Sequence, residues 1–64
     1  MHAELKKYLE ESLQKKKGLT FHLNGTTMVG YVTRIIDDNA IEVVNREISK
    51  GLIFTDQIHA LEMS

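Results

Sequence analysis

The longest run of like charge in the chain is Lys15-Lys16-Lys17, which follows Gln14. Clustered lysines bind phosphate groups through charge alone, which is the chemistry of contacts to a nucleic-acid backbone. The same lysines also suit the carboxyl end of a helix, where the helix dipole stabilises cations. The whole chain carries a net charge of −1, so the sequence does not indicate a general polyanion binder. Both interpretations of the lysine run therefore stay open.

Residues that could carry catalysis are present but poorly spaced. Asp37 and Asp38 are adjacent, so they should point to different sides of a turn and make a poor acid–base pair. No serine has the context of a nucleophile elbow, and no glycine-rich phosphate loop precedes a helix. The chain has no cysteine, and its three histidines lack metal-ligand spacing. We predict a protein that is not an enzyme and uses no metal or cofactor.

One helix and about five short strands are expected to position the polar groups. Apolar residues recur at helical spacing through residues 3–17, and Gly18 stands where a left-handed C-cap is expected. From Leu19 onward the apolar period changes to two, with turn signals between the runs. Strands are predicted at 19–24, 27–36, 40–45, 48–54 and 57–62. The predicted fold is mainly β with one N-terminal α-helix: a strongly bent five-stranded antiparallel sheet or small open barrel, in one domain spanning residues 1–64.

Gly30 interrupts the longest predicted strand, where a β-branched or aromatic residue would be favoured. A glycine inside a strand indicates a sharp bend or a close approach of backbone, as a small barrel needs. A tolerated packing glycine is the alternative.

Assembly is expected to stabilise so short a chain. A 64-residue domain buries only about 60% of its unfolded surface, and this one has no disulfide to compensate. Leu52, Ile53 and Phe54 are three consecutive apolar residues, which indicates that both faces of their strand are covered. The chain has no second layer to do so, and we therefore predict a neighbouring subunit. Edge-to-edge pairing that is not isologous either closes into a ring or continues as a filament, and the ring is the soluble outcome.

This outline resembles the Sm-like (Lsm) family, and is closest in outline to its Hfq branch of bacterial RNA chaperones. The resemblance covers about Tyr8 to Leu61 and is carried by "YLEESLQKKKGLTFHLNG", "GYVTRIIDDNAIEVVN" and "IFTDQIHAL". Family members place an aspartate after the long second strand and then an alternating apolar strand, a pattern that Asp37, Ile41 and Val43 fill. The resemblance implies a ring of about five to seven copies in which the fourth strand pairs with a neighbour's fifth. The subunit interface would then include Leu52, Ile53, Phe54, Ile58 and Leu61.

The resemblance also implies surfaces for single-stranded RNA. The basic rim of the family corresponds to Lys15, Lys16 and Lys17. The base-stacking position of the uridine pocket falls on Asn39, beside the turn Phe54-Thr55-Asp56. An Hfq-type pocket has an aromatic platform and a cation there, and we expect neither in this chain, so the uridine site should be absent or altered.

The opposite face of an Hfq ring stacks adenines on an aromatic of the first strand. Counting from the hairpin glycine assigns that role to Phe21, whereas alternation places Phe21 in the core and His22 outside. An exposed His22 could stack a base, although an exposed strand histidine more often has no specific role. Tyr31, the other aromatic near the hairpin, is also a candidate RNA-binding residue, although the sequence does not predict which face of the sheet carries it.

The sequence thus predicts a homo-oligomeric ring that binds single-stranded RNA. The alternative is a ring-forming protein-interaction or assembly module that has lost RNA binding, and a third is a monomeric SH3-like adaptor. We expect no small-molecule substrate and no membrane partner, because no apolar run approaches the roughly 20 residues that span a bilayer. The lack of cysteine fits a reducing compartment, and a cytoplasmic location is expected.

Overall fold

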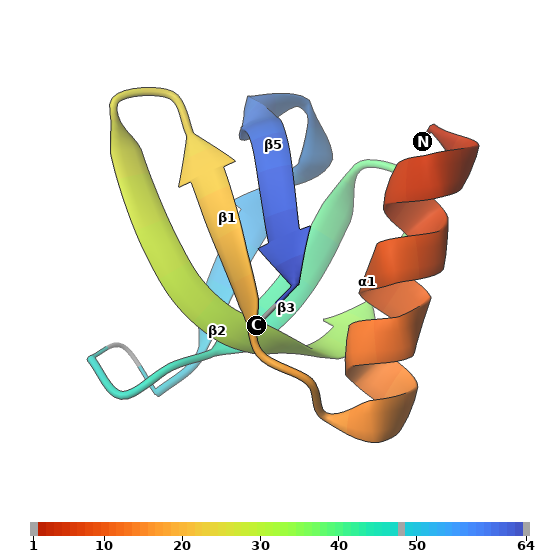
Figure 1. Ribbon diagram of the computed structural model, residues 1–64, viewed down its shortest axis with the longest axis horizontal. Helices are drawn as coiled ribbons and strands as arrows, with labels where there is room; N and C mark the ends of the chain where they lie inside the picture. The colour runs from red at the N-terminus through yellow and green to blue at the C-terminus, as the bar shows by residue number, and fades with distance from the viewer. Residues whose placement is uncertain (1, 48, 64) are drawn as a thin grey trace.

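The computed structural model describes residues 2–47 and 49–63 and confirms a mainly β chain with one N-terminal helix (Figure 1). Its elements are α1 (Ala3–Lys15), β1 (Leu19–Leu23), β2 (Thr26–Ile35), β3 (Ala40–Val44), β4 (Gly51–Phe54), the 3-10 turn η1 (Thr55–Gln57) and β5 (Ile58–Met63). The strands pair antiparallel in the order β4-β3-β2-β1-β5. The sheet is bent but not closed, so β4 and β5 are its two edges although they follow one another in the chain.

The helix begins where its first backbone amides find acceptors. The Nδ1 atom of His2 accepts a hydrogen bond from the backbone N–H of Glu4 at 3.3 Å, and the carbonyl of His2 accepts one from Lys6. Leu9 is fully buried against the sheet, and Leu5 and Leu13 pack beside it at helical spacing. Figure 1 shows α1 along one side of the sheet.

The helix ends two residues earlier than predicted, and the expected C-cap at Gly18 is wrong. Lys16 adopts the left-handed conformation, with φ 55°, directly after the last helical residue. The physical reason lies one turn back, at Ser12. Its hydroxyl donates a hydrogen bond of 2.7 Å to the carbonyl of Lys17, which holds the chain in this early turn.

Ser12 also ties the helix to the sheet. It is the buried polar side chain of the described core, and its Oγ accepts a hydrogen bond of 3.0 Å from the backbone N–H of Val32 on β2. One hydroxyl therefore satisfies a carbonyl at the helix end and an amide of the central strand. Buried backbone groups need such partners, because water cannot reach them.

Replacing Ser12 with alanine should lower the free energy of unfolding by about 1–3 kcal/mol, the cost of leaving buried polar groups without partners. Urea unfolding followed by circular dichroism measures this loss. Gln14→Ala is the matched control, because Gln14 is exposed on the same helix and its loss should cost less than about 0.5 kcal/mol. An equal, small effect of both variants would contradict the bridging role of Ser12.

Gly30 lies at the corner of the sheet, and its close backbone approach is confirmed. Residues 26–30 of β2 pair with β1, whereas the strand pairs with β3 from Tyr31 onward. A Cβ atom at Gly30 would lie 2.7 Å from the carbonyl oxygen of Val44. Only glycine lets β2 change partners here without pushing β3 away.

The core lies inside the bend and follows the predicted alternation. Phe21 is fully buried on β1 and His22 faces outward, as the period of two predicts. The buried apolar core residues are Leu9, Leu19, Phe21, Val32, Ala40, Ile41, Val43 and Ile53.

The fourth strand is shorter than predicted. It begins at Gly51 rather than at residue 48, and Ser49 has a positive φ of 43°, which interrupts an extended strand. Ile48, which the prediction placed in this strand, lies outside the described residues. The edge strand β4 therefore offers four residues for pairing.

Candidate functional site

The predicted lysine run lies at the end of α1, but the carboxylate of Glu11 forms ion pairs with two of its three lysines. The Nζ of Lys17 lies 3.0 Å from Glu11 Oε1, and the Nζ of Lys15 lies 4.0 Å from the same atom. The hydrogen bond from Lys17, followed by the attraction of its charge, keeps the pKa of Glu11 below its usual value of 4.5. Lys16 is exposed and makes no ion pair within residues 2–47 and 49–63. It is the lysine of the run that is open to a phosphate.

Replacing Glu11 with glutamine should release both neighbouring lysines and strengthen any polyanion binding at this helix end. Because its pKa is lowered in the folded chain, ionised Glu11 stabilises the fold at pH values above its usual pKa. This stabilisation is lost as the pH falls through the lowered pKa. We expect the logarithmic salt dependence of RNA affinity to steepen by about one for each additional phosphate that the lysines bind. Glu10→Gln is the control, since Glu10 is exposed and neutralises no lysine of the run. Equal effects of the two variants would show that only net charge matters.

Asn39 and the turn at 54–57 lie together, as the resemblance implies. Asp37 shapes this region by accepting hydrogen bonds through Oδ1 from the N–H groups of Asn39, at 2.7 Å, and Ala40, at 3.1 Å. The carbonyl of Asn39 then accepts a hydrogen bond of 2.8 Å from the N–H of Thr55. The start of β3 and the end of β4 are thereby fixed to each other.

A small open hollow of about 330 Å³ results, lined by Asn39, Phe54, Thr55, Asp56 and Gln57. The expected stacking position, Asn39, carries no ring, but Phe54 of the adjacent turn lines the hollow and is 54% exposed, so an aromatic side chain is available there. An aromatic ring and two side-chain amides can stack a base and hydrogen-bond its edge. Asp56 disfavours a phosphate at the same place. The hollow suits an uncharged base edge better than a backbone.

His22 is exposed but already has a partner. Its Nε2 lies 2.6 Å from Glu62 Oε1, which connects β1 to the edge strand β5. The residues lie diagonally across the strand pair, since His22 is directly opposite Ala60. His22 therefore helps to hold β5 against β1. The structure does not bring it to Asn39 or to the lysine run.

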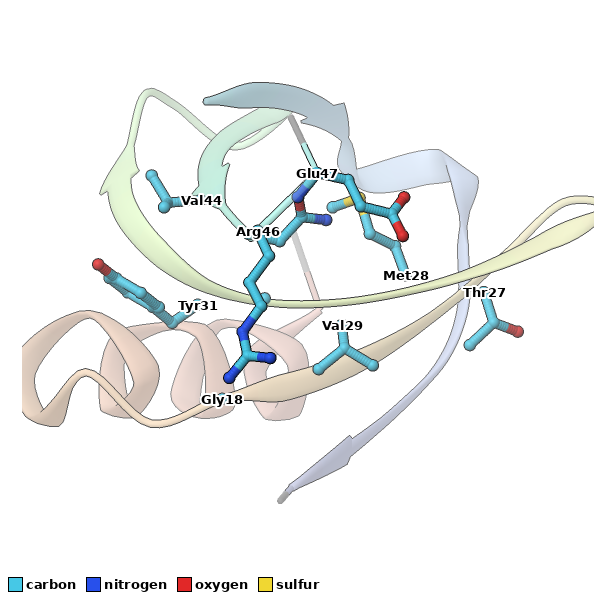
Figure 2. A pocket seen from close by; sticks show the side chains of 10 residues that line it. Gly18, Thr27, Met28, Val29, Tyr31, Val44, Arg46 and Glu47 are labelled. Atoms are coloured by element: carbon cyan, nitrogen blue, oxygen red, sulfur yellow. The ribbon is translucent and has the colours of Figure 1, made fainter. Parts of the chain in front are cut away.

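Tyr31 faces a second, larger hollow on the outer side of β2 (Figure 2). Arg46 and Glu47, from the loop after β3, line it as well. Sequence reasoning missed Arg46, because a lone arginine in a turn carries no pattern. Only the fold of the β3–β4 loop brings it over β2.

The predicted interface residues divide between the surface and the core. Leu52 and Phe54 are exposed to 53% and 54% on β4, so both are open to a partner. Ile53 instead packs in the core of its own chain, at 6% exposure, and the expectation that it faces a neighbour is wrong. Ile58 and Leu61 on β5 are half-buried and pack against the same core. Three consecutive apolar residues thus mark one inward side chain between two outward ones.

Among the described residues, no group of three or more histidine and acidic side chains lies close enough to hold a metal ion. In that same part of the chain, no helix is long and apolar enough to cross a bilayer.

No protein-family model matches the chain, and no curated protein or solved structure is significantly similar to it. The resemblance to Sm-like proteins therefore rests on the sequence motifs.

Proposed function

We propose that the chain assembles into a closed ring by pairing β4 of one copy with β5 of the next, and that the ring binds single-stranded RNA. The observation that carries the assembly is the pair of free edges on one sheet. A free edge presents unpaired N–H and C=O groups, and natural monomers protect such edges with charge, proline or a covering element. Here the edge strand β4 carries the exposed apolar residues Leu52 and Phe54.

The two edges differ in sequence, so pairing one with the other is heterologous. Heterologous contacts repeat from copy to copy and end either in a ring or in a filament. The bend of the sheet at Gly30 rotates β4 relative to β5, which supports closure into a ring. Each contact would also cover apolar side chains that a 64-residue core leaves exposed.

RNA binding is supported by two features that differ in chemistry. The hollow beside Asn39 combines the ring of Phe54, the last residue of β4, with the amides of Asn39 and Gln57, which suits an unpaired base provided that the subunit contact covers Leu52 and leaves this ring open. Lys16 offers an exposed cation at the end of α1. Each contact is weak by itself, and a ring repeats it in every subunit, so that a flexible strand gains affinity through effective concentration.

A second candidate is a ring that binds proteins rather than RNA. It is favoured by two acidic residues that oppose phosphate binding. Glu11 forms ion pairs with Lys15 and Lys17, and Asp56 lines the Asn39 hollow. The net charge of −1 points the same way.

Fluorescence anisotropy with short uridine-rich and adenine-rich RNAs, over a range of salt concentrations, separates the two candidates. The proposal predicts binding that weakens with salt and that falls when Lys16 is replaced by glutamine. Lys6→Gln is the matched control, because Lys6 is also exposed, at the other end of α1. A ring that binds neither RNA at low salt would leave the protein-binding candidate standing.

A further inference from the structure

The larger hollow occupies the outer face of β2, away from both edges of the sheet (Figure 2). It is an open hollow of about 780 Å³, lined by residues 27–31 of β2, by residues 44–47 from the end of β3 and the loop that follows, and by Gly18. This volume is in the range of small-ligand sites. Val29 is 56% exposed in it, and Tyr31 is half-buried beside it. An apolar floor that is open to water needs an explanation in so small a protein.

Arg46 gives the hollow its charge. Figure 2 shows its side chain extending across β2, and Tyr31, Val29 and Gly18 line the same hollow. No carboxylate within residues 2–47 and 49–63 forms an ion pair with Arg46. The carboxylate of Glu47 lies toward Met28, on the other side of the hollow. A planar cation over an apolar floor thus has no acidic partner within the described fold.

We propose that this hollow is a nucleotide seat for single-stranded RNA, in which a base stacks on Tyr31 and Val29 while Arg46 binds the adjoining phosphate. The inference rests on the proposed RNA binding and adds a site to it. Base stacking uses any exposed π-face, and a guanidinium matches the paired oxygens of a phosphate. Because β2 is the middle strand of the sheet, pairing of β4 with β5 would leave the seat open in every subunit.

The seat is distinct from the other two RNA contacts. The hollow beside Asn39 is built by the start of β3, the end of β4 and η1, and it shares no residue with this one. Lys16 lies at the end of α1, two residues before Gly18. A strand that ran from Lys16 over Gly18 would therefore meet Arg46 next, which places the seat on a path for one continuous RNA.

The test measures fluorescence anisotropy of the intact chain with labelled RNAs of about 12 nucleotides, within the site sizes of single-strand binders, and with an abasic strand of equal length. Arg46→Gln should weaken RNA binding at least about fivefold and reduce the logarithmic salt slope by about one. Arg34→Gln is the matched control, since it removes the same charge from an arginine that lies outside the hollow, 3.8 Å from Glu42. It should change affinity less than twofold.

The aromatic half of the seat is tested separately. Wild-type protein should prefer RNA over the abasic strand, and Tyr31→Leu should reduce that preference at least about fivefold, the effect of losing one stacked base. Tyr31→Phe keeps the ring and should restore the preference. Thermal unfolding of each variant shows whether a loss comes from the fold.

The outcomes distinguish this inference from the proposed function. RNA binding that responds equally to Arg46→Gln and Arg34→Gln, or an unchanged preference in a folded Tyr31→Leu variant, would overturn the seat alone. A wild-type chain that binds no RNA would overturn both. Equal affinity for RNA and for an acidic peptide of the same charge would show that the hollow recognises anions of either kind, which also contradicts a nucleotide seat.

Discussion

Replacing Leu52 with lysine should prevent the proposed ring from forming and leave a monomer of 7.3 kDa. Leu52 is 53% exposed on the outer strand β4, where a subunit contact would bury it. A lysine there is the device that natural sheets use to block edge pairing, because its charge would have to be desolvated at the contact. Size-exclusion chromatography with light scattering measures the mass.

The control for this variant is Val29→Lys, which places the same charge on a similarly exposed residue of the central strand β2. It should leave the mass unchanged, since β2 has partners on both sides. Loss of assembly in both variants would indicate a general effect of surface charge. An assembly that survives Leu52→Lys would contradict contact through β4.

Replacing Gly30 with alanine should lower the free energy of unfolding by about 1–3 kcal/mol, the usual cost of forcing an extra group into packed structure. The added Cβ would lie 2.7 Å from the carbonyl oxygen of Val44, and that atom belongs to the backbone of β3 and cannot rotate away. A 64-residue domain has a total stability of about 3–10 kcal/mol, so this is a large fraction. Urea unfolding measures the loss.

Thr27→Ala provides the comparison on the same strand, because Thr27 is exposed and its substitution creates no clash. It should cost less than about 1 kcal/mol, the span of strand propensities. If Gly30→Ala were as mild as Thr27→Ala, the close approach of β2 and β3 would not constrain the bend.

Much of this fold could be predicted because the spacing of apolar residues within a helix or strand indicates which of its faces is buried. The helical spacing of Leu5, Tyr8, Leu9 and Leu13 predicted one buried face, of which Leu9 is buried, Leu5 and Leu13 are partly buried and Tyr8 is 37% exposed. The alternation at Phe21 predicted a buried side chain, and Phe21 is fully buried. Gly30 was also informative, since a strand tolerates glycine poorly unless backbone comes close.

The remaining features depend on contacts between distant segments. The left-handed turn moves from Gly18 to Lys16 because the hydroxyl of Ser12 captures the carbonyl of Lys17, and a buried serine looks like any helix serine in the sequence. Arg46 reaches Tyr31 only through the fold of a loop. Local patterns contain no information about either.

The position of the candidate site could be predicted from the sequence, but the exposure and the net charge of its side chains could not. Asn39 does lie beside the turn at 54–57, but the sequence did not show that the ring of Phe54 in this turn is exposed and lines the hollow. The lysine run is present, but Glu11 is placed one helical turn before Lys15 and offsets its charge. Whether charges cancel depends on three-dimensional distances.

Native mass spectrometry of the unmodified chain would show whether copies assemble through the two free edges of the sheet. The proposed ring predicts one discrete species of about five to seven copies of the 7.3 kDa chain, the range that Sm-like rings imply. A single species at 7.3 kDa would contradict it, because β4 and β5 would then remain unpaired in solution.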